Sequence, residues 1–309
     1  MRIAAAVALL FALAGPADAL ASRVWISGKG TDTAGCGPIA TPCRTLQFAH
    51  DQTTAGGEID VLDPAGYGAV VITKAISIVN DGAGVAGVLA QAGGNAVTIN
   101  AGTSDNVLLR GLAIAGGGVG LNGVVLNSAA RLVVENCSVR DFPASSPNGT
   151  GIWLKPAALN SVKVFVTNTT ISNNGYIGLF AQGANRASID LHVDRSSATF
   201  NQYGIVTRSV NGSSVQAHIS NSAMSFNSTR GLDIYGDGMD GLYTTIARAY
   251  LDSLQFYGNG YDIVSNPGVG VVVLSRVTAE GNISGSFTSY GNNNLDFLYG
   301  SSVGTKSTK

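Results

Sequence analysis

The amino-acid sequence predicts an all-β fold of the solenoid type, in which short strands wind into stacked coils. Three observations support this prediction: a repeat of roughly 27 residues, alternation of apolar and polar residues within that repeat, and 41 glycines among 309 residues. An apolar fraction of 45% excludes a disordered chain. The 18 basic and 19 acidic residues are too sparse and too balanced for electrostatic binding of nucleic acid, so we expect no such partner.

Pairs of glycine and an aliphatic residue carry the repeat. They recur at almost equal steps along the chain, at Gly151-Ile152, Gly178-Leu179, Gly204-Ile205 and Gly231-Leu232. An alternating run begins ten residues after each of the first three aliphatic residues, at Val162, Ile189 and Val215. Each run ends near an asparagine: Asn174, Asn201, Asn227, then Asn259 and Asn282. A single coil cannot bury its apolar side chains, so the coils must stack with equivalent positions in columns.

The N-terminus has the pattern of a secretory signal peptide at residues 1–19. Arg2 precedes an apolar run over 3–14, and Ala17-Asp18-Ala19 forms a small-residue cleavage site. An apolar run of about a dozen residues is too short to span a bilayer. We therefore expect a secreted or periplasmic protein with no membrane span, whose mature chain begins near Leu20.

Cysteine usage agrees with an oxidising compartment. Cys36 and Cys43 lie seven positions apart in a segment rich in glycine and proline, which predicts a local disulfide. Two free thiols are the alternative, and a zinc site is disfavoured because no second Cys/His pair lies nearby. Cys137 follows an apolar run, and we expect it to be a small buried residue.

Residues 20–57 are expected to form an N-terminal cap with a short helix near 43–52. Thr41 and Pro42 suit the N-cap and the first helical position, and His50 is expected on the helix surface. A helix over the first coil would cover a strand edge that could otherwise pair with another chain. The coils should occupy residues 58–282. Residues 283–309, where the pattern decays, should form a C-terminal cap and a polar tail.

Stacking of the coils predicts which residues become neighbours. Val139, Ile171, Ala198 and Met224 should form one internal column. Asn136, Asn168 and Asn221 should occupy one corner, because asparagine tolerates a left-handed backbone. Leucine-rich repeats and propellers fit less well, since regularly spaced leucine is missing and propeller blades are longer than this repeat.

The N-terminal segment resembles the opening of exported proteins of the pectin lyase-like superfamily. The resemblance rests on 27–32, Cys36, 42–46, 56–59 and Asp63-Pro64 with Gly66-Tyr67, and it covers the remaining chain only as a repeat pattern. It implies a right-handed parallel β-helix with three sides and internal stacks of aliphatic residues and asparagine. Many members bind, cleave or epimerise acidic polysaccharides. The catalytic motifs of polygalacturonases and alginate epimerases are missing from this chain, and fold alone does not carry function.

Alignment of the coils places outward residues in three columns. The first column is Arg131, Lys163, Asp190 and Gln216; the second is Val133, Phe165, His192, His218 and Arg248; the third is Glu135, Thr167, Asp194, Ser220 and Tyr250. Neighbours in a column lie about 4.8 Å apart. We call Lys163, Asp190, His192, Asp194 and His218 the predicted patch.

The predicted patch suggests a catalytic site for a glycan. An imidazole beside a carboxylate can transfer a proton near neutral pH. Lys163 or Arg248 could neutralise a uronate carboxylate, and Phe165 and Tyr250 could stack on sugar rings. The alternative is an ordinary solvated sheet face.

A glycine-rich segment offers the alternative of a calcium site. Asp233, Asp237 and Asp240 stand among three glycines, and their oxygens could bind Ca²⁺. The spacing is not that of an EF-hand, and such a segment is more often a plain solvated turn. We therefore expect no metal and no cofactor, with calcium as the alternative.

Two classes of function remain open: a carbohydrate-binding or carbohydrate-active protein, and a non-catalytic exported solenoid. The sequence favours a secreted β-helix protein that contacts polysaccharide through one outward sheet face. The alternatives are a pectin lyase-like polysaccharide lyase or hydrolase, and a non-catalytic structural or adhesive surface solenoid. We expect a monomer.

Export and oxidation can be tested together. The secreted protein should begin near Leu20 and should carry a Cys36–Cys43 disulfide, which an intact-mass measurement before and after reduction detects. A mature chain that still begins at Met1, or one whose mass does not change on reduction, would contradict this prediction.

Overall fold

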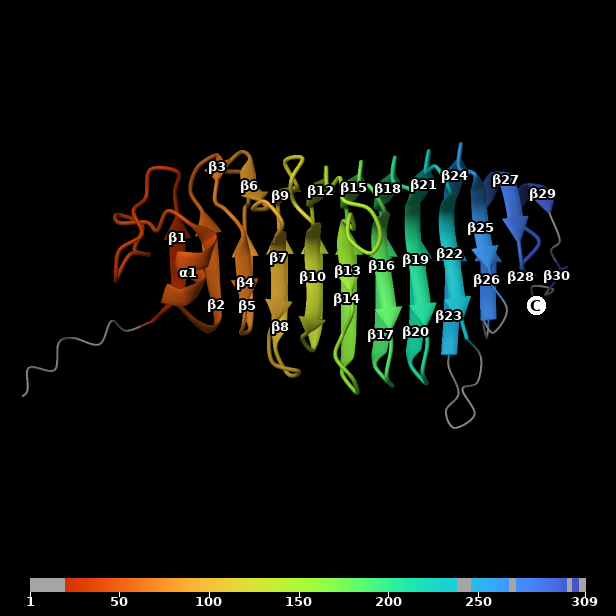
Figure 1. Cartoon of the computed structure of the whole chain (residues 1–309), viewed down its shortest axis with the longest axis horizontal. Coiled ribbons are helices and arrows are strands. Elements are labelled where there is room, and N and C mark those ends of the chain that lie inside the picture. The colour runs from red at the N-terminus through yellow and green to blue at the C-terminus, as the bar shows by residue number, and fades with distance from the viewer. Residues whose placement is uncertain (1–19, 238–245, 267–270, 299–301, 306–309) are drawn as a thin grey trace, which may run out of the picture.

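The computed structural model describes residues 20–237, 246–266, 271–298 and 302–305. The expected signal peptide at 1–19 lies outside the described residues. The chain winds into an elongated solenoid in which the strands of successive coils lie side by side, as Figure 1 shows. All strand pairings are parallel, and one helix is present among the described residues. The predicted fold class, an all-β parallel β-helix with a short N-terminal helix, is confirmed.

The strands form three faces along the solenoid axis. The first face is a sheet of 12 strands. It comprises β1 (Ala21–Ile26), β2 (Thr53–Val61), β5 (Ile76–Val79), β8 (Asn106–Arg110), β11 (Arg131–Glu135), β14 (Ser161–Thr167), β17 (Ser188–Asp194), β20 (Ser214–Ser220), β23 (Ile246–Asp252), β26 (Val271–Ser275), β28 (Ser286–Ser289) and β30 (Ser302–Thr305).

The second and third faces share 18 strands because β27 (Thr278–Ser284) and β29 (Asn294–Leu298) pair within both. The second face otherwise comprises β3 (Ala65–Gly66), β6 (Ala86–Leu89), β9 (Leu112–Ala115), β12 (Ser138–Arg140), β15 (Thr170–Ser172), β18 (Ser197–Thr199), β21 (Ala223–Ser225) and β24 (Gln255–Tyr257). The third comprises β4 (Val70–Ile72), β7 (Asn95–Asn100), β10 (Asn122–Ser128), β13 (Ile152–Leu154), β16 (Ile177–Gly183), β19 (Tyr203–Ser209), β22 (Arg230–Gly236) and β25 (Tyr261–Ser265).

Apolar side chains fill the space between the three faces. The predicted internal column is confirmed: Val139 pairs with Ile171, Ile171 with Ala198 and Ala198 with Met224, and all four are buried. Burial of each aliphatic side chain of this kind stabilises the fold by about 1.5–3 kcal/mol. The core is therefore continuous from coil to coil, as a solenoid requires.

The predicted asparagine corner is confirmed as well. Asn136, Asn168 and Asn221 have φ angles of 52°, 48° and 48°, in the left-handed region. Arg195 and Ser253 take the same corner in other coils, with φ of 46° and 55°. The corner turns the chain from the first face to the second.

A second asparagine series forms a buried ladder. The side-chain amide of Asn174 donates to Oδ1 of Asn201 at 2.9 Å, Asn201 donates to Asn227 at 3.2 Å, and Asn227 donates to Asn259 at 3.0 Å. Each Oδ1 also accepts the backbone N–H of the preceding asparagine, which ties neighbouring coils together. Asn282, the last member of the sequence series, is exposed and lies outside this ladder.

The N-terminal cap differs from the expected one at three places. The helix α1 (Leu46–Gln52) is capped by the Thr45 side chain and not by Thr41, because Cys43 is still extended and bridges to Ile26. His50 is buried, with Nδ1 2.9 Å from a carboxylate oxygen of Asp51 and Nε2 accepting the backbone N–H of Thr73. Burial lowers the pKa of His50. Strand β1, which was not expected, pairs with β2 and adds a strand before the first coil.

The cysteines lie as expected. Cys36 and Cys43 form a disulfide with a Cα–Cα distance of 5.1 Å. Cys137 is buried, and burial raises the pKa of its thiol to about 11. At the other end of the chain, parallel strands continue beyond 282 as β28 and β30, where Ser and Thr alternate with few apolar residues.

The asparagine ladder should be essential to stability. Asn201→Ala removes acceptors for two donors of Asn174 and leaves buried polar groups without partners, each costing about 1–3 kcal/mol. We expect urea unfolding to show a loss of about 3 kcal/mol. Asn106→Ala is the matched control, because Asn106 is exposed and should change stability by less than about 0.5 kcal/mol. Equal effects of the two substitutions would contradict a structural role for the ladder.

Candidate functional site

The structure brings most of the predicted patch together on the first face. Strands β14, β17 and β20 pair in the expected register, with Lys163 beside Asp190 and His192 beside His218. Asp190 and His192 alternate along β17, so both point outward. The expected order of these columns is therefore confirmed as far as β20.

The expected positions of Arg248 and Tyr250 are wrong by two positions. Arg248 pairs with Gln216, and it is Tyr250 that lies beside His218. The reason is the coil before β23, which is longer than the coils before it, so that Val215 pairs with Ala247. The sequence does not show which residues of a longer coil are the inserted ones. The predicted register after the insertion is therefore shifted.

Four rings on the first face stack on one another. The centroid distances are 4.9 Å for Phe165–His192, 4.9 Å for His192–His218 and 4.8 Å for His218–Tyr250, with nearly parallel planes. The guanidinium group of Arg131 lies 5.8 Å from the centre of the Phe165 ring. Because the rings cover one another, this ring ladder offers a ligand mainly ring edges. A sugar ring therefore has no open face on Phe165 against which to stack.

Each of the two histidines has a polar neighbour. Oδ1 of Asp190 is buried and lies 3.1 Å from Nε2 of His192, without hydrogen-bond geometry. The side-chain amide of Gln216 lies 2.8 Å from Nε2 of His218, which accepts from it when the ring is neutral. Burial lowers the pKa of His218, and the neighbouring His192 lowers it further. The lowered pKa favours the neutral form of the His218 imidazole.

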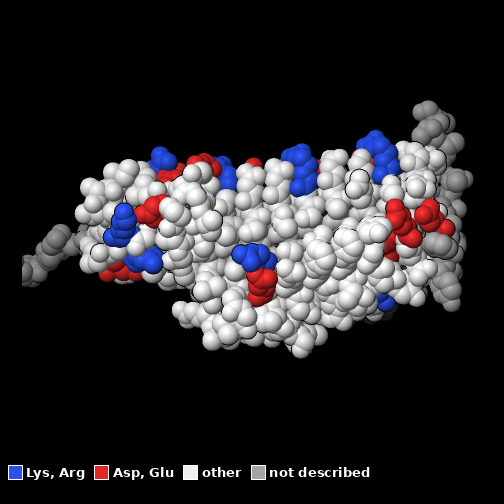
Figure 2. All heavy atoms as spheres, turned by 90° about the horizontal axis from the view of Figure 1, so that it is seen from above, with Lys and Arg blue, Asp and Glu red and all other residues white. Residues whose placement is uncertain are grey.

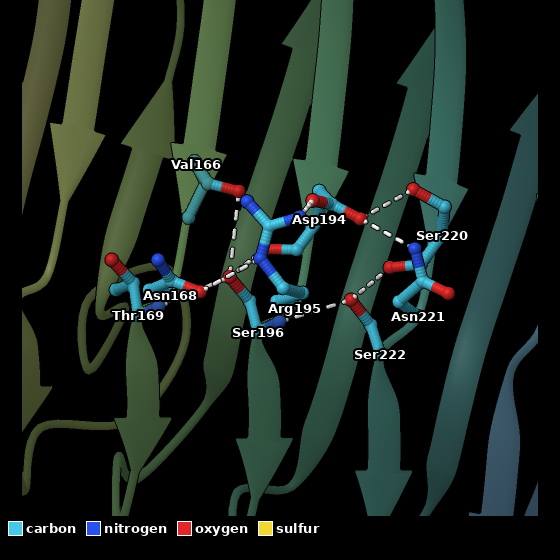
Figure 3. A network of polar contacts seen from close by, with 9 residues as sticks. All are labelled: Val166, Asn168, Thr169, Asp194, Arg195, Ser196, Ser220, Asn221 and Ser222. Carbon is cyan, nitrogen blue, oxygen red and sulfur yellow. Dashed lines mark hydrogen bonds and ion pairs between the residues drawn. The ribbon is translucent and has the colours of Figure 1, made fainter.

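Asp194 belongs to the asparagine corner rather than to the ring ladder, as Figure 3 shows. Its Oδ1 accepts from the Asn221 amide at 2.9 Å and from the Ser220 hydroxyl at 2.8 Å, and its Oδ2 lies 2.5 Å from Nη1 of Arg195. Arg195 also donates to Asn168 at 3.0 Å. These contacts, led by the Asn221 hydrogen bond, lower the pKa of Asp194. The carboxylate is occupied by its neighbours and holds the corner of adjacent coils together.

The third face carries a hollow that the sequence analysis missed. It has a volume of about 400 Å³ and is built by β16, β19 and β22. We call it the aromatic hollow, and its lining is Tyr176, Ile177, Phe180, Tyr203, Val206, Arg208, Arg230, Asp233, Tyr235 and Asn266.

Aromatic side chains form the walls of this hollow. The rings of Tyr176 and Tyr203 meet edge to face at 5.7 Å, and Phe180 stacks with Trp153 at 6.0 Å. Phe180 and Val206 point away from the solenoid core, in an outward column, yet they are buried under these larger side chains. The hollow therefore has an apolar floor outside the main core.

Charged groups lie at one end of the aromatic hollow. Nη1 of Arg230 lies 2.5 Å from Oδ2 of Asp233, and the Asn266 amide donates to Oδ1 of Asp233 at 2.9 Å. Burial raises the pKa of Asp233. The Nε atom of Arg230 is buried and has no hydrogen-bond partner among the described residues. The guanidinium of Arg208 lies over the ring of Tyr235 at 5.4 Å. Of these two guanidinium groups, that of Arg230 is paired with the Asp233 carboxylate, whereas that of Arg208 contacts the Tyr235 ring.

The aspartates of the expected calcium loop do not form one cluster in the described part of the chain. Asp233 lies within β22 and is paired with Arg230, while Oδ2 of Asp237 accepts the backbone N–H of Asn211 at 3.1 Å. Asp240 lies outside the described residues. Among those described, no group of three or more His, Cys, Asp or Glu could hold a metal ion. Calcium binding, the alternative to the expected absence of a metal, remains untested, and no chemical step is derived through it.

A sequence signal for the aromatic hollow exists. Tyr176, Tyr203 and Arg230 recur at the spacing of the coil repeat, just before its glycine-aliphatic pairs. The same repeat that reveals the coils places Tyr203 and Arg230 in one column with Ile177, and Tyr176 precedes that column by one residue. The outward columns predicted from the sequence all lie on the first face, so none of them includes these residues.

Comparisons with known proteins report on the fold. No protein-family model matches the chain, and no curated protein matches it. Among solved structures, pectate lyase Pel9A matches with a TM-score of 0.52 and 13% sequence identity, covering 93% of this chain and 80% of that chain. At this identity the likeness shows the parallel β-helix fold and nothing further. No helix among the described residues is long and apolar enough to cross a membrane.

The corner around Asp194 predicts a dependence of stability on pH. The folded pKa of Asp194 lies below the unfolded value, so its stabilising contribution is present above about pH 4 and is lost as pH falls through the lowered pKa. Between about pH 5 and pH 3, the melting temperature of the native chain should fall more steeply than that of Asp194→Asn. Asp296→Asn, at an exposed site, is the control. Parallel curves for all three proteins would contradict the assignment.

Proposed function

We propose that this protein is an exported β-helix protein that binds an acidic polysaccharide in the aromatic hollow. The observation that carries the proposal is the combination, within about 400 Å³, of tyrosine walls with two guanidinium groups for one carboxylate. A volume of this size lies within the range of ligand-binding pockets, about 300–1,000 Å³. The tyrosine rings suit the apolar side of a sugar ring, and the spare guanidinium suits a uronate carboxylate.

Arg208 is the residue proposed to select the acidic sugar. None of the contacts among the described residues pairs Arg208 with a carboxylate, and its guanidinium is held over the Tyr235 ring. A planar guanidinium can donate two parallel hydrogen bonds to a carboxylate, which a lysine ammonium cannot do. Asp233 is already engaged by Arg230 and Asn266, so it leaves Arg208 available for the ligand.

Two features support an extracellular polysaccharide as the partner. The Cys36–Cys43 disulfide agrees with an oxidising compartment. The matched structure is titled a pectate lyase, so a protein of similar fold acts on an acidic polysaccharide. Lyase or hydrolase activity, and a purely structural or adhesive role, remain the alternatives to simple binding.

The predicted patch is the second candidate site, and its role would be proton transfer. The contact between Asp190 and His192, next to a neutral His218, favours this role. The stacked rings and the occupied Asp194 make the same face a weaker candidate for binding a sugar ring. Lys163 has no ion-pair partner among the described residues and remains a candidate for contact with a uronate.

Substitutions in the aromatic hollow test the proposal. Arg208→Gln should weaken binding of polygalacturonate by about tenfold, because one charge-assisted contact is lost. Tyr203→Ala should weaken polygalacturonate binding by a similar factor, because it removes one of the tyrosine rings that line the aromatic hollow. Isothermal titration calorimetry at low salt measures both effects. Arg248→Gln is the matched control, since Arg248 is an exposed arginine on the first face.

The control also separates the two candidate sites. Weaker binding by Arg248→Gln together with unchanged binding by Arg208→Gln would place the ligand on the first face and contradict the proposal. Breakdown of the polymer that disappears in His218→Ala would establish the predicted patch as catalytic. Absence of binding to any acidic polysaccharide would leave the structural solenoid as the better account.

A further inference from the structure

Two phenylalanines occupy a backbone position that does not favour them. Phe200 follows β18 and Phe226 follows β21, and both have a φ angle of 56°. Other coils carry Asp141, Asn173 or Gly258 at this position, also with positive φ. The backbone hydrogen bonds confirm the equivalence, since Asn173, Phe200 and Phe226 each donate to the carbonyl of the next coil.

The left-handed conformation makes phenylalanine a costly choice here. Asparagine, aspartate and glycine adopt this region readily, whereas a bulky side chain is a genuine outlier in it. Strained residues of this kind persist where the surrounding structure holds them, and they gather at functional sites. Two such residues occur in consecutive coils, at a turn where neighbouring coils have Asn or Gly. Because the turn can form without phenylalanine, we look for a functional reason for these two residues.

The rings form an exposed row along one edge of the solenoid. Phe200 and Phe226 stack at 5.2 Å, and Tyr257 of β24 meets Phe226 edge-on at 5.3 Å. The three residues are 57%, 46% and 53% exposed. A Cβ atom at Gly258 would lie 2.8 Å from the Phe226 ring, so glycine at 258 allows that ring its place. We call Phe200, Phe226 and Tyr257 the aromatic row.

The coil segments that carry the aromatic row contain no charged residue. No Asp, Glu, Lys, Arg or His occurs in 170–185, 196–207, 221–229 or 253–261, which comprise both strands and turns. Charge on this edge begins beyond them, with Asp141 at the equivalent turn two coils before Phe200 and exposed Glu280 on β27, which pairs with β24. The four segments supply amide and hydroxyl groups instead, from Asn173, Gln202, Ser228 and Thr229. Figure 2, which looks onto the upper edge of Figure 1, shows charged side chains in separate clusters with wide uncharged surface between them.

We propose that the aromatic row is a second binding site, and that it takes a neutral polysaccharide lying along the solenoid edge. Exposed aromatic rings suit the apolar C–H surface of a pyranose chain, and the flanking amides and hydroxyls suit its hydroxyl groups. The absence of charged residues from these coil segments matches an uncharged polymer and distinguishes this site from the aromatic hollow with its two guanidinium groups. The protein would then bridge an acidic and a neutral glycan.

Other occupants fit the aromatic row less well. A stable interface with a second copy needs about 800 Å² from each partner, whereas three half-exposed rings supply about 300 Å². A membrane surface is favoured by basic residues around exposed apolar groups, and the four coil segments here have none. Both occupants are included as arms of the test.

Sedimentation of the full-length secreted protein with microcrystalline cellulose and with chitin tests the proposal. The native protein should be retained by at least one of them, and high salt should not weaken retention because no charge takes part. Phe200→Asn with Phe226→Asn should weaken retention about tenfold. Its melting temperature should be equal or higher, because asparagine suits the left-handed backbone. Tyr257→Ser is a second variant at an ordinary strand position, where Ser225 stands in the preceding coil.

The outcomes separate this site from the aromatic hollow. The proposal is supported if the double variant and Tyr257→Ser are no longer retained while Arg208→Gln is retained like the native protein. Retention that survives both changes, or a native protein that neither polymer retains, overturns it. Binding to vesicles of neutral phosphatidylcholine, or concentration-dependent dimerisation that the double variant abolishes, would overturn it in favour of those partners. Polygalacturonate binding by the double variant should be unchanged, so the two proposals can fail independently.

Discussion

The parallel hydrogen bonding between successive coils is the constraint on which the rest of the structure depends. It fixes equivalent residues one strand spacing apart, so any residue type repeated at the coil period becomes a column. Inside, this gives the aliphatic column and the asparagine ladder, in which each Oδ1 accepts from the coil before. Outside, it gives rows of rings and ion pairs between neighbouring coils, such as Arg276 with Asp252. A substitution at one position therefore acts on three coils, and functional surfaces can be built from single residues contributed by consecutive coils.

Strand register could be predicted from the sequence where the coil length is regular, and it could not where the coil length changes. Register was predictable from Val162 to Ser220 because these coils are nearly equal in length and apolar residues alternate without a break. It failed at Arg248 and Tyr250, where the coil is longer and nothing in the sequence marks which residues bulge. Burial of His50 and capping by Thr45 depend on contacts of the N-terminal segment with the first coil, and local propensity does not contain these.

The outer surface shows two uses of aromatic residues that composition alone cannot distinguish. On the first face, Phe165, His192, His218 and Tyr250 stand directly above one another, so their faces are closed. On the third face, Tyr176 and Tyr203 meet edge to face and leave room beside them. The second arrangement leaves space between tyrosine rings, whereas the hollow of about 420 Å³ on the first face lies beside the ring ladder, next to His218 and Tyr250. The choice of candidate site therefore moves from the face rich in histidine to the face rich in tyrosine, where we propose that Arg208 selects an acidic sugar while Arg230 engages Asp233.

A structure of the protein determined with a saturating galacturonate oligosaccharide tests the central claim most directly. The account predicts a sugar ring against Tyr203 in the aromatic hollow, with its carboxylate paired to the guanidinium of Arg208. A ligand found instead across Asp190 and His192 on the first face, or no ordered ligand at saturating concentration, would contradict it.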